Sequence, residues 1–564
     1  MAAATQGAFC VTSDNVINVS DGTPELTPAQ KEILTQPLIE GSTNATPYPV
    51  VKDGEGELVI SGTTGNMEIT NPLVVREGTL TVDGVSIDSK SPFSNFVPYL
   101  SVGGKNATLK LDNGATVSHE LGNTSPSNYC GSMSLGTADG AAKVVLDNGS
   151  TLHTDHFIIA GDPDGNGSSY GGAGTGHTKY TYEDLQGTAI RYTGGDEGPT
   201  TIDVQGGSTL SAGTSLQFAD VTVNIQGDGS QMVDNTRNLA INTPDCGSYF
   251  GYERSSTDGV TTEINITEGG AYICNWNLST GGSERMDEVT DENRNRVSIL
   301  VSGKDAETGA ASSISVAGHM ALGGNLCPGE TPDSDSHTTL TVENGGVAYL
   351  NVVTIGGEGY GKAEMTVGEG SYVYKHTAPK YAESITGPFT EPVIIVGDNG
   401  SLTNAGTMEI DTVLNGGVFT MLDKAVAAGL TTTSGELNIC GNVTFTGNVT
   451  VSSDTILTFD LGSTLNLDGS SFSFEGGMIY VELGSVNAEG LTTPYFTMGY
   501  TAEGSIFFNE ATFIQLVQNG VEVGDAMRLQ VGTNVATKLI PEPASATLSL
   551  AALMMLCARR RRKN

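Results

Sequence analysis

Residues 101–117 read Ser101-Val-Gly-Gly-Lys-Asn-Ala-Thr-Leu-Lys-Leu-Asp-Asn-Gly-Ala-Thr-Val117, and they contain the unit on which the fold depends. Polar and apolar residues alternate in Thr-Leu-Lys-Leu, which is the period of two that a β-strand with one buried face requires. The Asn-Gly that follows supplies the positive φ angles of a tight corner. This stretch therefore predicts a Gly-rich turn, a strand, a tight turn and a second short strand.

The same unit recurs along most of the chain. Residues 134–152 and 354–373 align with it by eye, and residues 201–210, 263–272 and 339–348 are looser copies. Two architectures fit: a stack of antiparallel hairpins, for which Asn-Gly is the strongest short signal, and a coil of parallel strands. A unit of roughly 20 residues that repeats many times favours the coil, because each rung of a solenoid contacts only its neighbours. We expect an all-β chain folded as a right-handed parallel β-helix (β-solenoid), with one short hydrophobic helix at its C-terminal end.

Composition narrows the class of protein. The chain has 564 residues, of which 75 are Gly, and Lys+Arg 26 against Asp+Glu 64 gives a net charge of −38. This balance argues against a nucleic-acid partner, since binding to phosphates depends on Lys and Arg. Seven cysteines lie far apart with no C-x-x-C, so neither a zinc site nor a disulfide-dense scaffold is indicated. We expect small buried thiols.

We expect four segments. Residues 1–50 form an N-terminal segment and cap, in which Thr27 as N-cap, Pro28 at the first helical position and Gln30 in a capping box predict a short helix. Residues 51–480 form the solenoid repeats. Residues 481–540, where larger apolar residues replace the Gly-rich turns, form a closing β cap. Residues 541–564 form a C-terminal signal.

That C-terminal signal has three ordered parts. Pro541-Glu542-Pro543 precedes a mostly apolar run, 544–558, and the chain then continues with Arg559, Arg560, Arg561, Arg562 and Lys563. At 1.5 Å per residue the apolar run spans about 22 Å, less than the ~30 Å hydrocarbon core of a bilayer. Such a short run is suited to temporary insertion into the membrane, and the basic cluster would stay on the cytoplasmic side as a stop-transfer signal.

These three parts closely resemble the C-terminal sorting signal of bacterial PEP-CTERM proteins. The resemblance covers only residues 541–564, and it implies an exosortase-type processing enzyme as partner, transient insertion of 544–558 into the inner membrane, and delivery to the cell surface. The first nine residues have no basic region and no continuous apolar run, so a missing or removed leader is also implied. The body repeats resemble the passenger repeats of autotransporter-like proteins, although no strands that would form a translocating barrel follow them.

One short motif raises the question of a metal. In Asp162-Pro163-Asp164-Gly165-Asn166-Gly167 the oxygen-bearing residues Asp162, Asp164 and Asn166 and a Gly at position six match the first half of a calcium loop, but position twelve is Ala173. Two interpretations stay open, a Ca²⁺ site completed by a distant carboxylate and a solvated turn, and the sequence favours the turn. His153 and Asp155 should share one face of a strand while His156 points away, so they cannot clamp one metal from a single strand.

We therefore expect a non-catalytic protein without a required cofactor: an exported, surface-sorted solenoid with a structural or adhesive role in the cell envelope and a surface polysaccharide as partner. The alternative is a polysaccharide lyase or glycoside hydrolase, because such enzymes are often built on parallel β-helices. An enzyme of that kind needs a carboxylate pair and aromatic platforms for sugar rings. Trp276 is the sole tryptophan, and sequence alone does not show which carboxylates meet across rungs.

Overall fold

The computed structural model describes a chain that folds into two compact units. Unit 1 comprises Met1–Val353, Gly359–Ala363 and Lys375–Glu391, and unit 2 comprises Thr354–Glu358, Glu364–Tyr374 and Pro392–Asn564. Within them the described residues are 9–10, 16–22, 24–35, 50–71, 73–89, 99–120, 133–136, 140–155, 157–161, 182–183, 189–190, 199–234, 247–251, 260–281, 294–324, 336–357, 360–377, 391–486, 495–500 and 504–529.

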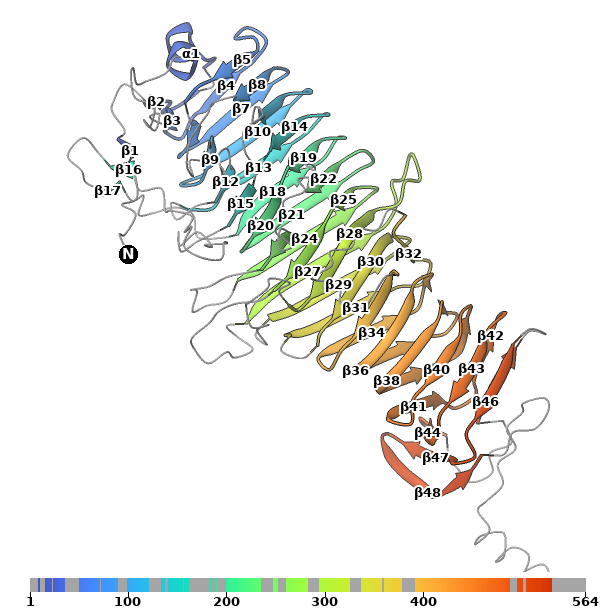
Figure 1. The fold of residues 1–564 in the computed structure, drawn as a ribbon. Helices are drawn as coiled ribbons and strands as arrows, with labels where there is room; N and C mark the ends of the chain where they lie inside the picture. Colours follow the sequence, from blue (N-terminus) through green and yellow to red (C-terminus); the bar gives the residue numbers. More distant parts are fainter. Residues whose placement is uncertain are drawn as a thin grey trace, which may run out of the picture. The chain divides into compact units, whose positions relative to one another are not determined.

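Unit 1 is a three-sided coil of parallel strands, in which each turn of the chain adds one strand to each side (Figure 1). Face A contains β4 (Glu57–Ile60), β7 (Thr79–Asp83), β10 (Thr108–Asp112), β13 (Lys143–Leu146), β18 (Thr200–Val204), β21 (Val221–Gln226), β24 (Thr261–Thr267), β27 (Asn295–Ser302) and β29 (Ser336–Glu343). Face B contains β5 (Met67–Ile69), β8 (Ser86–Ser89), β11 (Thr116–His119), β14 (Thr151–Thr154), β19 (Thr209–Ala212), β22 (Gln231–Asp234), β25 (Ala271–Cys274) and the first half of β28 (Ser313–Leu322). Face C contains β2 (Val16–Asn18), β3 (Val50–Asp53), β6 (Leu73–Val75), β9 (Leu100–Val102), β12 (Met133–Leu135), β15 (Phe157–Ala160), β20 (Ser215–Phe218), β23 (Gly247–Phe250), β26 (Asn277–Thr280) and the second half of β28.

Unit 2 is also a three-sided parallel coil, with sides that we name A′, B′ and C′. Face A′ contains β34 (Gly400–Asn404), the second halves of β36 (Asp411–Met421) and β38 (Leu430–Ile439), β41 (Thr455–Asp460), β44 (Gly477–Glu482) and β47 (Thr512–Gln518). Face B′ contains β35 (Thr407–Met408), β37 (Val426–Ala427), β39 (Asn442–Phe445), β42 (Ser463–Leu467) and β45 (Phe496–Tyr500). Face C′ contains β33 (Val393–Val396), the first halves of β36 and β38, β40 (Val449–Val451), β43 (Ser471–Phe474) and β46 (Ser505–Phe508). The boundary between the units falls within β30 (Val347–Ile355), β31 (Lys362–Val367) and β32 (Tyr372–Lys375).

The predicted parallel β-helix is confirmed, and the hairpin alternative is wrong. The faces described above are built from parallel pairs, whereas β16 (Tyr182–Glu183) with β17 (Ala189–Ile190), and β47 with β48 (Val521–Arg528), pair in antiparallel fashion. β1 (Phe9–Cys10) joins β16 in a separate small sheet. Right-handed crossing is the sense that connections between parallel strands take in proteins.

The corner between faces A and B explains why Asn-Gly does not make a hairpin here. Asn113 and Gly114 have φ angles of 55° and 73°, and Asn148 and Gly149 have 52° and 75°. Two consecutive residues with positive φ turn the chain sharply. The strand that follows then pairs with the previous and the next rung instead of folding back on the strand before it.

Registered rows of aliphatic side chains form the core. In unit 1 one row on face A joins, rung by rung, Leu58, Leu80, Leu109, Val144, Ile202, Val223, Ile264, Ile299 and Leu340, and each of these is at most 1% exposed. In unit 2 the corresponding row is Leu402, Phe419, Leu437, Leu457, Ile479 and Ile514. Full burial of one such side chain contributes about 1.5–3 kcal/mol, so the repeated rows supply most of the hydrophobic stabilisation.

The N-terminal end of unit 1 has a short helix, α1 (Pro28–Thr35), as the sequence predicts. The capping box is present: Thr27 N donates to Gln30 Oε1 over 2.8 Å, and Gln30 N donates to Thr27 Oγ1 over 3.3 Å. Leu34 is buried, and its carbonyl accepts a hydrogen bond from Thr70 N, just after β5. The helix thus covers the first strand of face B.

A buried lysine ties together the first rungs of unit 1. Lys52 is fully buried, and its Nζ donates to the carbonyl oxygens of Gly54, Gly56 and Glu77, each at 2.5 Å. Burial lowers the pKa of Lys52 to about 8, although the nearby carboxylates oppose this shift. The ammonium group therefore bridges two successive turns of the coil.

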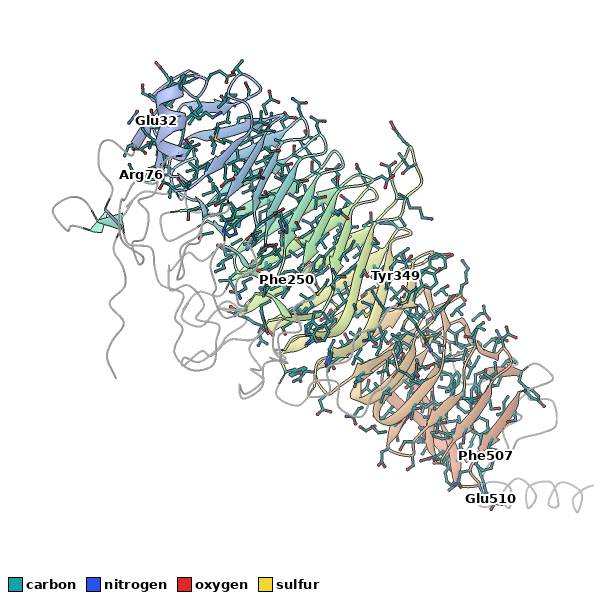
Figure 2. All side chains as sticks on the ribbon, turned by 45° about the horizontal axis from the view of Figure 1, so that its top comes forward. Glu32, Arg76, Phe250, Tyr349, Phe507 and Glu510 are labelled. Atoms are coloured by element: carbon teal, nitrogen blue, oxygen red, sulfur yellow. The ribbon has the colours of Figure 1, made fainter. Side chains whose placement is uncertain are left out.

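The coil of unit 2 continues in parallel through residues that the sequence assigned to a cap. β45 and β46 still pair with the preceding rung, and the direction changes only at β48. Phe507 of β46 is 59% exposed, and it lies close to Glu510 in the view of Figure 2. An antiparallel strand on β47 ends the hydrogen-bonding ladder of face A′.

Candidate functional site

An outward-pointing row on face B carries the chemically most varied side chains of unit 1. Register places Glu68, Asp88, Ser118, His153 and Ser211 on five successive rungs. Neighbouring strands lie about 4.8 Å apart, so adjacent members are within hydrogen-bonding reach. Ser118 Oγ donates to Asp88 Oδ1 over 2.7 Å. We call these five residues the face B row.

His153 is the centre of this row. Its Nδ1 lies 2.7 Å from Ser211 Oγ on the next rung, and its Nε2 lies 3.2 Å from Asp155 Oδ1 in the turn that follows β14. The main chain of Asp155 is held by a hydrogen bond from its N–H to the carbonyl of His119. Both ring nitrogens of His153 are therefore occupied, one by a hydroxyl and one by a carboxylate.

Tyr99 and His119 form a buried aromatic pair next to the main chain of His153. Tyr99 Oη donates to the main-chain carbonyl of His153 over 2.8 Å. The rings of Tyr99 and His119 stack with centroids 4.8 Å apart. Burial, reinforced by the charge of Asp155, raises the pKa of Tyr99 well above its usual value, so the phenol stays protonated as a donor.

The Ser211, His153 and Asp155 side chains contain the groups of a hydrolase triad but are poorly placed for that chemistry. A nucleophilic hydroxyl has to face the substrate, and Ser211 is only 7% exposed. The His153 side chain is 22% exposed, so the imidazole edge and the neighbouring oxygens can still contact a ligand. The arrangement is suited to hydrogen bonding with a polar ligand rather than to nucleophilic attack.

A second polar cluster lies inside the coil. Tyr272 Oη donates to Asp234 Oδ2 over 2.8 Å, Ser248 Oγ donates to the same oxygen, and all three residues are buried. Burial raises the pKa of Tyr272 and of the neighbouring Cys274 well above their usual values. These groups contact each other and not the surface, so they stabilise the interior of the coil.

Several predicted site residues lie outside the described residues. They are the calcium-loop residues Asp162, Asp164 and Asn166, the motif Pro541, Glu542 and Pro543, the apolar run 544–558 with its short hydrophobic helix, and Arg559, Arg560, Arg561, Arg562 and Lys563. Among the described residues, no helix is long and apolar enough to cross a membrane. That part of the chain also holds no group of three His, Cys, Asp or Glu residues placed to bind a metal.

Other expectations concern residues that the structure does describe. His153 and Asp155 do share a face, as predicted, and they contact each other. Cys274 is a buried thiol, as expected, and it donates to the main-chain carbonyls of Trp276 and Asn277, whereas the Cys440 thiol is half-buried. His337 lies in β29 beside Arg296 of β27.

Sequence reasoning missed Ser211 and the connection between Asp88 and Ser118. Ser211 follows His153 by 58 residues, so no local motif joins them. A signal was present in the matching triplets Thr151-Leu152-His153 and Thr209-Leu210-Ser211, which occupy equivalent positions on adjacent rungs. Alignment of the repeats by their strand triplets would have placed the two side chains together.

Comparison with known proteins gives no match: no protein-family model, no curated protein and no solved structure is significantly similar to this chain.

Proposed function

We propose that this chain is a non-catalytic structural or adhesive protein of the cell envelope, exported and sorted to the surface through residues 541–564. The observation that carries the proposal is the regular outer surface of the coil. On face A, outward side chains bond to their counterparts on the next rung, as in Asn224 Nδ2 to Asp203 Oδ1 at 2.8 Å and Asn265 Nδ2 to Asn224 Oδ1 at 3.1 Å. Such rows provide a long contact surface instead of one convergent pocket.

Charge is consistent with an extracellular contact role. The net charge of −38 keeps the chain soluble and repels anionic surfaces unless divalent cations bridge them. Neutral partners carry no such repulsion, which supports a neutral surface polysaccharide over an anionic one. Pro541, Glu542 and Pro543 would be recognised by an exosortase-type enzyme while 544–558 holds the chain in the inner membrane.

The sorting step is testable in the native host. The double variant Pro541→Ala and Pro543→Ala should leave full-length protein in the membrane fraction, whereas the wild type should give a surface species that ends near Pro541. Intact-mass analysis of both fractions measures this difference. Pro392→Ala is the control, because it changes a proline far from the signal. Normal surface release of the double variant would refute the sorting role.

A glycoside hydrolase is the second candidate, and one observation favours it. Glu68 and Asp88 point outward from neighbouring rungs, so their Cα atoms lie about 4.8 Å apart. Retaining glycosidases hold two carboxyl groups about 5–5.5 Å apart, and side chains that start from adjacent rungs can bring their carboxyl groups to such a separation. If the chain is such an enzyme, release of reducing sugar from a surface polysaccharide should disappear in Glu68→Gln and in Asp88→Asn. Lack of turnover by the wild type on the polysaccharide to which it binds would exclude this candidate.

A further inference from the structure

Face A′ of unit 2 carries apolar side chains where a solenoid normally carries polar ones. Ile456, Met478 and Phe513 occupy one outward row on three successive rungs, β41, β44 and β47. Tyr480 stands in the neighbouring row, beside Met478 on the same strand. Ile456 is 46% exposed, and the other three side chains are half-buried. We call these four residues the apolar strip.

The equivalent position in unit 1 shows that the strand geometry does not demand apolar residues here. The outward row of face A runs Glu57, Thr79, Thr108, Lys143, Thr201, Thr222, Glu263, Ser298 and Thr339. In both units the inward rows hold the core. Three consecutive outward apolar side chains, one exposed and two half-buried, thus gain nothing for the interior that Thr would not, and they offer an apolar contact on an otherwise polar sheet face.

Polar side chains occupy the preceding rungs of the two rows that contain the apolar strip. Thr458 and Asn438 precede Tyr480 in its own row, and Glu436 precedes Ile456 and is exposed. Rows on one strand are about 6.8 Å apart, since they are two residues apart along it. The surface therefore offers apolar groups next to hydroxyl, amide and carboxylate groups.

The size of the strip limits its occupant. Three rungs at about 4.8 Å and two rows at about 6.8 Å give an area on the order of 200 Å². A stable protein partner needs about 800 Å² on each side, so the strip is too small to hold a second copy of the chain or another globular protein. An extended polymer about one residue wide fits it.

We propose that the apolar strip binds a linear neutral polysaccharide of the outer layer. Sugar rings have apolar C–H faces, which stack on aromatic and aliphatic side chains, and hydroxyl edges, which hydrogen-bond to polar groups. The rings would lie over Met478, Tyr480 and Phe513, and the hydroxyl edges would face Thr458 and Asn438. The choice of a neutral polymer follows from the net charge of −38 and from the opposite charges at the two ends of the strip, Glu436 on the rung before Ile456 and Arg528 of β48 opposite Phe513. This inference names the ligand and the site of the adhesive role proposed above, and it rests on that role for the source of the polysaccharide.

The test uses the purified full-length chain and affinity electrophoresis. Gels contain hydroxyethylcellulose or galactomannan as neutral probes, or alginate as the anionic probe. The wild type should be retarded by at least one neutral polymer and not by alginate. The triple variant Ile456→Thr, Met478→Thr and Phe513→Thr should bind at least tenfold more weakly. Thr is the residue found most often in the equivalent row of unit 1, so the strands should form normally.

Leu300→Thr is the matched control, because Leu300 also points outward from face A and lies outside the strip. It should bind like the wild type, with all proteins showing the same circular dichroism spectrum and melting temperature. Equal binding by the triple variant, or no retardation of the wild type by either neutral polymer, would overturn the proposal. So would conversion of a wild-type oligomer to a monomer in the triple variant, which would assign the strip to a second copy.

The two proposals fail in different ways. If the chain binds a neutral polymer but is not released to the surface, the proposed binding site is supported and the proposed surface role is refuted. If the chain is sorted to the surface but binds neither neutral polymer, the proposed surface role is supported and the proposed binding site is refuted. Fractionation of cells answers the first question, and electrophoresis of the pure chain answers the second.

Discussion

The corner between faces A and B of unit 1 permits a quantitative test of how neighbouring rungs are joined. Asn148 Nδ2 donates to Asp112 Oδ1 on the preceding rung over 2.7 Å, and the main-chain N–H of Asn148 donates to Asp147 Oδ1 over 2.8 Å. Asn113 repeats the first contact one rung earlier, with Asp83 as its acceptor at 2.6 Å. Asn148 also has a φ of 52°. One side chain therefore supplies both an inter-rung bond and tolerance of left-handed backbone.

Substitution by two small residues separates these contributions. Asn148→Ala loses an exposed hydrogen bond to a carboxylate, at about 0.5–1 kcal/mol, and keeps a Cβ in the left-handed region without the local polar contacts that make Asn tolerate it, which costs about 1 kcal/mol more. Asn148→Gly loses the same bond but accepts the backbone conformation, so it should cost about 0.5–1 kcal/mol. The expected difference between the two variants is about 1 kcal/mol, with alanine the worse.

Hydrogen exchange followed by mass spectrometry measures this difference locally, because rungs of a solenoid contact only their neighbours. Peptides that cover β13 and β14 should exchange about tenfold or more faster in Asn148→Ala and about two- to fivefold faster in Asn148→Gly, since 1.4 kcal/mol corresponds to a factor of ten. Peptides from β41 to β44 in unit 2 should not change. They serve as the internal reference.

Equal exchange in the alanine and glycine variants would show that the backbone conformation of Asn148 carries no cost, and the argument from φ would fail. Unchanged exchange in both would show that the bond to Asp112 adds nothing. A third variant, Asn148→Asp, tests the charge. The bond to the Lys110 ammonium, followed by the Asn148 amide, holds the pKa of Asp112 below its usual value. A second carboxylate should therefore destabilise the corner more at pH 7 than at pH 3.

Two further predictions follow from buried titratable groups. Burial lowers the pKa of Lys52 from 10.5 to about 8, so between these pH values the unfolded chain binds more protons than the folded chain and this group makes stability rise with pH. Relative to Lys52→Met, the melting temperature of the wild type should therefore increase from pH 8 to pH 10. Parallel pH profiles of the two proteins would disprove this prediction. Burial, assisted by the charge of a nearby Asp in each case, raises the pKa of the Cys274 thiol well above its usual value and that of Cys440 to about 12. Peptide mapping after iodoacetamide treatment at pH 8 should find both thiols unmodified in the folded chain and modified in urea. Rapid labelling of Cys274 in the folded chain would contradict its burial.

The local elements could be predicted from the sequence because they depend on neighbouring residues. Alternation in residues 108–111 marks a strand whatever its partner is, and Thr27 with Gln30 forms a capping box within one helical turn. Asn113 and Gly114 indicated a tight corner but not its partner. A hairpin and a solenoid corner both need consecutive positive φ angles, so only the number of repeats distinguished them.

Register could not be predicted, and the candidate sites depend on register. His153 meets Ser211, and Met478 meets Phe513, because hydrogen-bonded strands bring distant residues to adjacent rungs. Connections of variable length separate these strands, so sequence distance does not reveal the pairs. In the sequence, Ile456 is one apolar residue among many, and only its outward direction makes it unusual.

The two kinds of row in this coil are under different physical constraints, and this difference indicates where function resides. An inward residue such as Val144 or Leu457 packs against the rungs on either side, so its size and polarity are fixed by the core. An outward residue needs only to suit a strand, and Thr or Asn does so at no cost to the interior. A cluster of outward residues on successive rungs that differs from the polar residues usual there therefore points to a reason outside the fold. The face B row around His153 carries groups that can hydrogen-bond to a polar ligand, and the strip of Ile456, Met478 and Phe513 carries apolar groups. Because the two departures lie on different units, substitutions in one should leave ligand contacts of the other unchanged, and the two surfaces can be tested as independent sites.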